Sequence, residues 1–192
     1  MIKVILASTS PYRKSLLERL NIPFSTRSPE VTEQQLEAEP AGEMVLRLAE
    51  AKARQVAESE IDALVIGSDQ ALVCEGEVLG KPMNADNAKR QLQAMRGKTL
   101  VFHTGLAVIN TSTAAIHRSV VDCTVSFREL EDAEIERYLE IEKPFNCAGS
   151  FKSEALGISL LDSLRGDDPT ALIGLPLIRL SQILRKEGLT VP

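Results

Sequence analysis

The sequence predicts a mixed α/β fold in a single domain spanning residues 1–192. Short β-branched apolar runs indicate strands, and amphipathic segments with helical spacing lie between them. Two long apolar runs joined by a short polar turn indicate an antiparallel pair, so the sheet is expected to be mixed rather than wholly parallel. A chain of 192 residues with 44% hydrophobic content is long enough to bury a sizeable core.

The first element is a strand at residues 2–6, followed by a hydroxyl-rich turn and a helix. Ser10 is a good N-cap residue and Pro11 suits the first helical position. The first turn of this helix carries Arg13, so amide groups, hydroxyls and a guanidinium meet at one point. That arrangement suits a phosphate group, and the alternative is an ordinary capped helix with a solvated basic first turn.

The remaining elements follow from periodicity and from turn residues. We expect an extended segment at 24–33, a helix from Pro40 to about Glu58, strands on both sides of a sharp break at Gly67-Ser68-Asp69, a Glu-Gly-Glu hairpin turn at 75–77, a helix at 85–95, antiparallel strands within 99–127, a helix at about 132–140, and a final amphipathic helix closed by Gly188.

Composition excludes several classes of protein. A net charge of −5 argues against a general nucleic-acid binder. No apolar run is long enough for a signal peptide or a membrane span, so we expect a soluble, cytoplasmic protein with no membrane partner. Oligomeric state is not fixed by the sequence, and a homodimer is left open. The cysteines are Cys74, Cys123 and Cys147. Their odd number and wide spacing indicate reduced thiols rather than a disulfide frame or a zinc site.

Familiar catalytic motifs are absent from the sequence, including the P-loop, the dinucleotide fingerprint, G-x-S-x-G and H-E-x-x-H. His103 and His117 both lie in strand-like runs, which argues against a triad built on either.

The remaining candidates are charged residues at the ends of elements. Asp69 follows an apolar run and is expected at a strand end, Glu33 ends the extended segment, and Lys81 lies in a "GKP" turn. Together with Lys52 and Arg13 they form the residue set of a metal-assisted polyphosphate site. Taken singly, Lys52 could equally be a helix-surface lysine and Glu33 an ordinary loop acid.

Six segments together resemble the Maf family of nucleotide pyrophosphatases, over residues 2–186. They are "ASTSPYRKSLL", "VIGSDQ", "GKP", "FHTGLAV", "CAGSFKSEALG" and "GLPL". The resemblance implies hydrolysis of a nucleoside triphosphate to the monophosphate and diphosphate, with a divalent cation, Mg²⁺ or Mn²⁺. It also implies a fold related to the inosine triphosphatases, in which a curved mixed sheet is flanked by helices and two lobes enclose a central cleft.

The resemblance also assigns roles to residues. Asp69 is implied to be the general base and a metal ligand, and Glu33 the acid on the metal side. The family commonly has an acidic pair where this chain has Thr32 and Glu33, so a second acid is missing there. The implied phosphate ligands are Ser8, Arg13, Lys52 and Lys81.

Three further positions are implied to select the substrate: Tyr12, Gln70 and Glu154. They resemble the branch of the family that acts on 7-methylguanosine triphosphate. Methylation makes the base cationic, so Tyr12 gains from stacking on it, and Glu154 can accept from both donors of the guanine pairing edge.

Two alternatives stay open: a pyrophosphatase for dTTP, UTP or modified nucleotides in general, and a nucleotide-binding regulator of septum formation. Asp69 together with Lys52 and Lys81 favours turnover, because a binding protein needs no positioned base.

Overall fold

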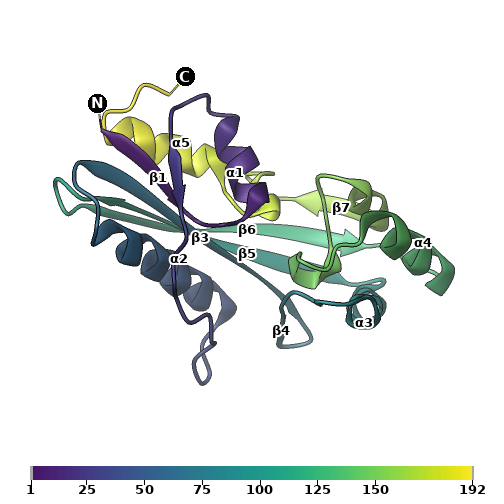
Figure 1. Ribbon diagram of the computed structural model, residues 1–192. Helices are drawn as coiled ribbons and strands as arrows, with labels where there is room; N and C mark the ends of the chain where they lie inside the picture. The colour runs from purple at the N-terminus through teal and green to yellow at the C-terminus, as the bar shows by residue number, and fades with distance from the viewer. Residues whose placement is uncertain (1, 192) are drawn as a thin grey trace. The chain divides into compact units, whose positions relative to one another are not determined.

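The computed structural model describes residues 2–191, and it confirms a mixed α/β fold (Figure 1). The strands are β1 (Lys3–Ala7), β2 (Ser25–Arg27), β3 (Ala63–Cys74), β4 (Glu77–Leu79), β5 (Thr99–Asn110), β6 (Ile116–Phe127) and β7 (Leu161–Arg165). The α-helices are α1 (Pro11–Glu18), α2 (Ala41–Ala57), α3 (Ala85–Met95), α4 (Asp132–Glu142) and α5 (Leu177–Lys186). Three short 3₁₀ turns complete the described elements: η1 (Ala148–Ser150), η2 (Leu156–Leu160) and η3 (Ala171–Ile173).

The described strands form one mixed sheet in the order β2-β1-β3-β5-β6-β7, with β4 paired to β3. β1 pairs parallel to both β2 and β3, whereas β4 pairs antiparallel to β3 and β7 antiparallel to β6. The parallel and antiparallel ladders together bear out the expected mixed sheet.

The chain divides into two compact units. Unit 1 comprises Met1–Gln70, His103–Val121 and Asp168–Pro192, and unit 2 comprises Ala71–Phe102 and Asp122–Asp167. Strands β3, β5 and β6 therefore contribute residues to both units.

Unit 1 has a helix layer on each face of its strands, with α1 and α5 on one face and α2 on the other (Figure 1). The alternation of side chains along β1 supplies both layers, because successive residues of a strand point to opposite faces. Leu6 belongs to the core cluster that contains Leu17 of α1 and Leu180 of α5. Ile5 belongs to the cluster that contains Ala49 of α2.

Unit 2 holds α3, α4, η1, η2, β4 and β7. Its core includes an aromatic group in which the ring of Phe151 lies 6.0 Å from that of Phe102 and 5.3 Å from that of Phe127. The hairpin between β3 and β4 turns at Glu75 and Gly76, whose φ angles are +54° and +86°, as a two-residue hairpin turn requires.

Most predicted elements are confirmed. Ser10 caps α1, because its side chain accepts from the amide of Arg13 and Pro11 takes the first helical position. The helix at 85–95, the hairpin around residues 110–113 and the helix closed before Gly188 also lie where the sequence places them. None of the helices among residues 2–191 is long and apolar enough to cross a membrane.

The predicted break at Gly67-Ser68-Asp69 is wrong, because β3 runs without interruption from Ala63 to Cys74. A Cβ atom on Gly67 would lie 2.1 Å from the carbonyl oxygen of Ala49 in α2. Glycine is therefore needed here because the helix backbone packs directly on the strand, and not because the chain turns. Asp69 consequently lies within a strand and not at a strand end.

Candidate active site

The turn after β1 brings Ser8 and Arg13 together. Ser8 is buried, and its hydroxyl oxygen accepts from the amide of Ser10 at 3.1 Å and from Nη1 of Arg13 at 3.5 Å. Nε of Arg13 donates to the carbonyl oxygen of Gly174 at 2.9 Å, which fixes the plane of the guanidinium. The phosphate-binding turn predicted from the sequence thus has its hydroxyl and its cation in contact.

The electrostatic surroundings of Arg13 have two opposing parts. Burial lowers the pKa of the Arg13 guanidinium, and the negative charges of Asp69 and Glu33 partly offset this effect. The cation of the turn and the two acids therefore act on one another electrostatically, although they come from different elements.

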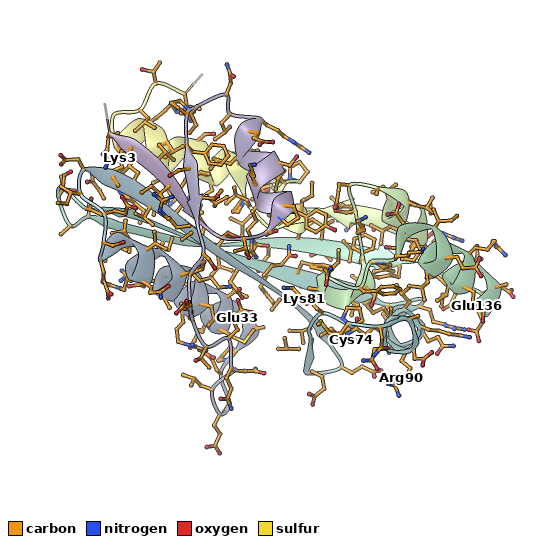
Figure 2. The ribbon with its side chains drawn as sticks, viewed as in Figure 1. Lys3, Glu33, Cys74, Lys81, Arg90 and Glu136 are labelled. Carbon is orange, nitrogen blue, oxygen red and sulfur yellow. The ribbon has the colours of Figure 1, made fainter. Side chains whose placement is uncertain are left out.

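Lys52 of α2 holds the two candidate acids at one point. Its ammonium nitrogen lies 2.6 Å from Oδ1 of Asp69 and forms a second ion pair with Glu33. Lys52 and Asp69 are both buried, whereas the side chain of Glu33 is 57% exposed and lies on the segment between β2 and α2 (Figure 2). The ordinary helix-surface position considered for Lys52 is excluded by this burial.

Close packing of α2 on the sheet explains how a lysine becomes buried here. A Cβ atom would lie 2.1 Å from the Ala49 carbonyl oxygen at Gly67 and 2.2 Å from the Val45 carbonyl oxygen at Gly105. Glycines on two neighbouring strands, β3 and β5, thus let the helix axis approach the sheet. Lys52 follows on the same helix, and its side chain reaches Asp69 of β3.

The next residue of β3 contacts a different part of unit 1. The side-chain nitrogen of Gln70 lies 2.8 Å from the carbonyl oxygen of Ala171, 3.0 Å from that of Leu172 and 3.2 Å from the hydroxyl oxygen of Thr104. Ser68, on the same face of the strand as Gln70, lies 2.8 Å from the carbonyl oxygen of Gly174. The segment 171–174 therefore supplies backbone acceptors to β3 as well as to Arg13.

Tyr12 lies in the first turn of α1, next to Arg13, and is half-buried. Unit 1 thus contains seven of the nine candidate residues: Ser8, Tyr12, Arg13, Glu33, Lys52, Asp69 and Gln70.

Lys81 and Glu154 belong to unit 2, and both are exposed. Lys81 follows β4 (Figure 2), and the residues on either side of it are anchored: the Gly80 carbonyl accepts from the side chain of Gln91 at 3.1 Å, and the Pro82 carbonyl accepts from Asn87. Glu154 lies between the turns η1 and η2. Their predicted roles stay predictions.

The two carboxylates that contact Lys52 supply oxygen atoms, the donor type that hard divalent cations take. The carboxylates of Glu33 and Asp69 converge on one nitrogen atom, so two oxygen donors meet there. Mg²⁺ in nucleotide sites commonly takes one or two protein carboxylates together with water and substrate phosphate oxygens. Among residues 2–191 there is no group of three or more His, Cys, Asp or Glu placed to hold a metal.

The family model for Maf-like protein matches residues 3–187 of this chain. The chain belongs to the Maf family. Curated relatives named "7-methyl-GTP pyrophosphatase" match over almost their whole length. The protein from Aromatoleum aromaticum is 56% identical over 190 residues, which cover 99% of this chain and 98% of the relative. The protein from Methylobacillus flagellatus is 52% identical, and the match covers 98% of this chain and 98% of the relative. The protein from Vibrio vulnificus is 51% identical, and the match covers 98% of this chain and 97% of the relative.

A solved structure, titled "Structure of a HAM1 protein from Coxiella burnetii", aligns with a TM-score of 0.45 and 13% identity over 68% of this chain and 75% of that chain.

Sequence reasoning missed the residues that support the site in this Maf-family chain. Thr104 and Gly174 are not among the predicted residues, and Ser68 is named only as part of the predicted break. Thr104 hydrogen-bonds to Gln70, and the Gly174 carbonyl oxygen accepts from both Ser68 and Arg13. Ser68 and Thr104 are fully buried polar residues, and a hydroxyl in a strand next to glycine was the one available signal.

Proposed function

We propose that this chain hydrolyses 7-methyl-GTP to 7-methyl-GMP and diphosphate, and so removes a modified nucleotide from the cellular pool. The observation that carries the proposal is the set of relatives at 51–56% identity, matched over nearly the full length of both chains, that bear this enzyme name. The geometry of unit 1 supports it, because a base candidate, a buried lysine and a guanidinium interact there.

In the proposed reaction a water oxygen bonds to phosphorus while the bond between the α- and β-phosphates breaks. Asp69 accepts the proton of the attacking water, as a positioned carboxylate can. Lys52 holds Asp69 at 2.6 Å and keeps the carboxylate oriented. Ser8 and Arg13 bind phosphate oxygens and offset the negative charge that develops on the leaving diphosphate.

Glu33 and Asp69 are proposed to hold a divalent cation, Mg²⁺ or Mn²⁺. When bound, the cation neutralises phosphate charge and orients the polyphosphate chain. Lys81 is proposed to contribute a further positive charge to the phosphates.

The base is proposed to be selected by Tyr12, Gln70 and Glu154. The aromatic face of Tyr12 attracts a cationic 7-methylguanine ring more strongly than a neutral base. The Glu154 carboxylate accepts from the two donors of the guanine pairing edge, which uracil and thymine cannot supply as a pair.

A diphosphate-release assay tests the proposal. The purified chain is supplied with Mg²⁺ or Mn²⁺ and separately with 7-methyl-GTP, GTP, UTP and dTTP, and metal dependence is tested by chelation and re-addition. We expect the highest kcat/KM with 7-methyl-GTP. Higher efficiency with UTP or dTTP would support a pyrimidine pyrophosphatase, and binding without turnover of any triphosphate would support a regulator.

Two substitutions separate the chemical and base-binding parts of the proposal. Asp69→Asn should lower turnover of all substrates by about a hundredfold or more, because it removes the base. Glu154→Gln should lower kcat/KM for 7-methyl-GTP by about ten- to a hundredfold, the usual loss of a charged hydrogen bond, while residual UTP turnover is spared. An even loss across all substrates would make Glu154 structural.

A further inference from the structure

The side-chain amide of Gln70 is held in one orientation by the protein itself. Its nitrogen lies within hydrogen-bond distance of the carbonyl oxygens of Ala171 and Leu172 and of the hydroxyl oxygen of Thr104. Backbone carbonyls can only accept hydrogen bonds, so the atom that faces them must be the NH₂ group. The amide oxygen of Gln70 is therefore directed away from the segment 171–174.

Thr104 is the side chain that completes this arrangement. It lies on β5, is fully buried, and donates its hydroxyl proton to the Ala171 carbonyl oxygen at 2.9 Å. With its proton committed, the hydroxyl can only accept from Gln70, at 3.2 Å. Thr104 thus adds a third acceptor to the two carbonyl oxygens and strengthens their preference, because the orientation rotated by 180° would place all three oxygen atoms against the Gln70 oxygen.

We propose that Thr104 is a positioning residue for base selection, which holds Gln70 so that its amide oxygen accepts a hydrogen bond from an amino-bearing purine base. Guanine carries an exocyclic amino group, whereas uracil carries two carbonyl oxygens and a single ring N–H. A fixed acceptor discriminates between them, while an amide free to rotate offers either of its ends and does not. The inference rests on the proposed function only in that it takes Gln70 to lie beside the base.

Binding of the nucleoside monophosphates tests the role without requiring turnover. The Kd values of 7-methyl-GMP and UMP are measured by titration calorimetry for the wild-type chain, Thr104→Val, Thr104→Ser and Gln70→Ala. We expect Thr104→Val to lower the preference for 7-methyl-GMP over UMP by about three- to tenfold, the loss of one neutral hydrogen bond. Thr104→Ser keeps the hydroxyl and should keep the preference.

The matched control is Thr99→Val, on the same strand. Thr99 hydrogen-bonds to Ser126 at 2.8 Å at an exposed position, so this substitution also removes one hydroxyl contact of β5 but does not touch Gln70. In the Gln70→Ala background, Thr104→Val should cause no further change in preference, because the residue acts through Gln70. Additive effects of the two substitutions would overturn the proposal, as would equal weakening of both ligands.

The side-chain amide resonances of Gln70, assigned by their loss in Gln70→Ala, give a second readout. We expect the amide protons to exchange with water several-fold faster in Thr104→Val than in the wild type and Thr104→Ser. Unchanged exchange would overturn the inference. If the wild-type chain binds 7-methyl-GMP selectively but releases no diphosphate, the proposed function is refuted and this inference stands. If the wild-type chain shows no preference between 7-methyl-GMP and UMP, the inference itself is refuted.

Discussion

Replacement of Lys52 by methionine tests how strongly the candidate site depends on one buried charge. The side chains of Lys52 and Asp69 are 7% and 12% exposed, so their ion pair is shielded from water. Methionine fills a similar volume but leaves the Asp69 carboxylate buried without its ammonium partner. Removing one member of a buried pair typically costs about 3–5 kcal/mol.

The lower end of that range applies here. Glu33, the other partner of Lys52, is 57% exposed, and water can replace its lost ion pair at little cost. We therefore expect Lys52→Met to lower the free energy of unfolding by about 3 kcal/mol, which corresponds to a fall in Tm of about 6–12 °C for a chain of this size. Urea unfolding followed by circular dichroism at pH 7 measures the change.

A double-mutant cycle assigns the loss to the pair. Lys52→Met combined with Asp69→Asn removes the stranded charge, so the double variant should regain about 2 kcal/mol relative to Lys52→Met alone. Lys14→Met is the control, because Lys14 and its partner Glu18 are 57% and 56% exposed and should contribute within about 0.5 kcal/mol. A loss below about 1 kcal/mol for Lys52→Met, or no recovery in the double variant, would refute the reasoning.

Two further predictions concern the surroundings of α2. Gly67→Ala should lower the free energy of unfolding by at least about 3 kcal/mol, because its Cβ would lie 2.1 Å from the Ala49 carbonyl oxygen. The control is Gly80→Ala, which has open space around its Cβ and should change the free energy of unfolding by less than about 0.5 kcal/mol in the same urea experiment. Hydrogen bonds from Arg118 lower the pKa of Glu50 to about 2 from its ordinary 4.5, so this carboxylate stabilises the fold fully above about pH 4.5 and loses its contribution as the pH falls toward 2. Glu50→Gln should therefore be less stable than the wild type by about 1 kcal/mol at pH 7, and the difference in Tm should vanish near pH 2; a constant difference would contradict the assignment.

The elements that the sequence predicts correctly are those specified by neighbouring residues. Ser10 and Pro11 fix the start of α1 because a cap acts within three residues, and Glu75-Gly76 fixes the β3–β4 turn through its own backbone angles. The resemblance to the Maf family, carried by short motifs, is confirmed by the match of the family model to residues 3–187.

What the sequence could not provide depends on contacts between distant segments. The role of Gly67 is set by a helix backbone eighteen residues earlier, at Ala49, and the hydrogen bonds of Gln70 join residues 34 and 101 positions apart. The burial of Lys52 likewise depends on a distant segment, because a lysine beside an apolar helix face is buried only if a carboxylate of the sheet pairs with it.

The uninterrupted course of β3 has a consequence for how the candidate site works. Successive side chains of a strand point to opposite faces, and here Asp69 contacts Lys52 of α2 while Gln70 contacts the segment 171–172 on the other face. The proposed chemical group and the proposed base-selecting group are therefore adjacent in sequence but are fixed by separate sets of contacts. A turn at Gly67, as predicted from the sequence, would not place the two side chains on opposite faces of a sheet. In a paired strand their faces are set by the register, and a shift of one residue would exchange the faces of Asp69 and Gln70. β3 pairs with β1 as far as Ile66 and with β4 from Leu72 onward, so its register is fixed on both sides of Asp69 and Gln70. A substitution at one of these two residues is therefore expected to leave the side chain of the other in place.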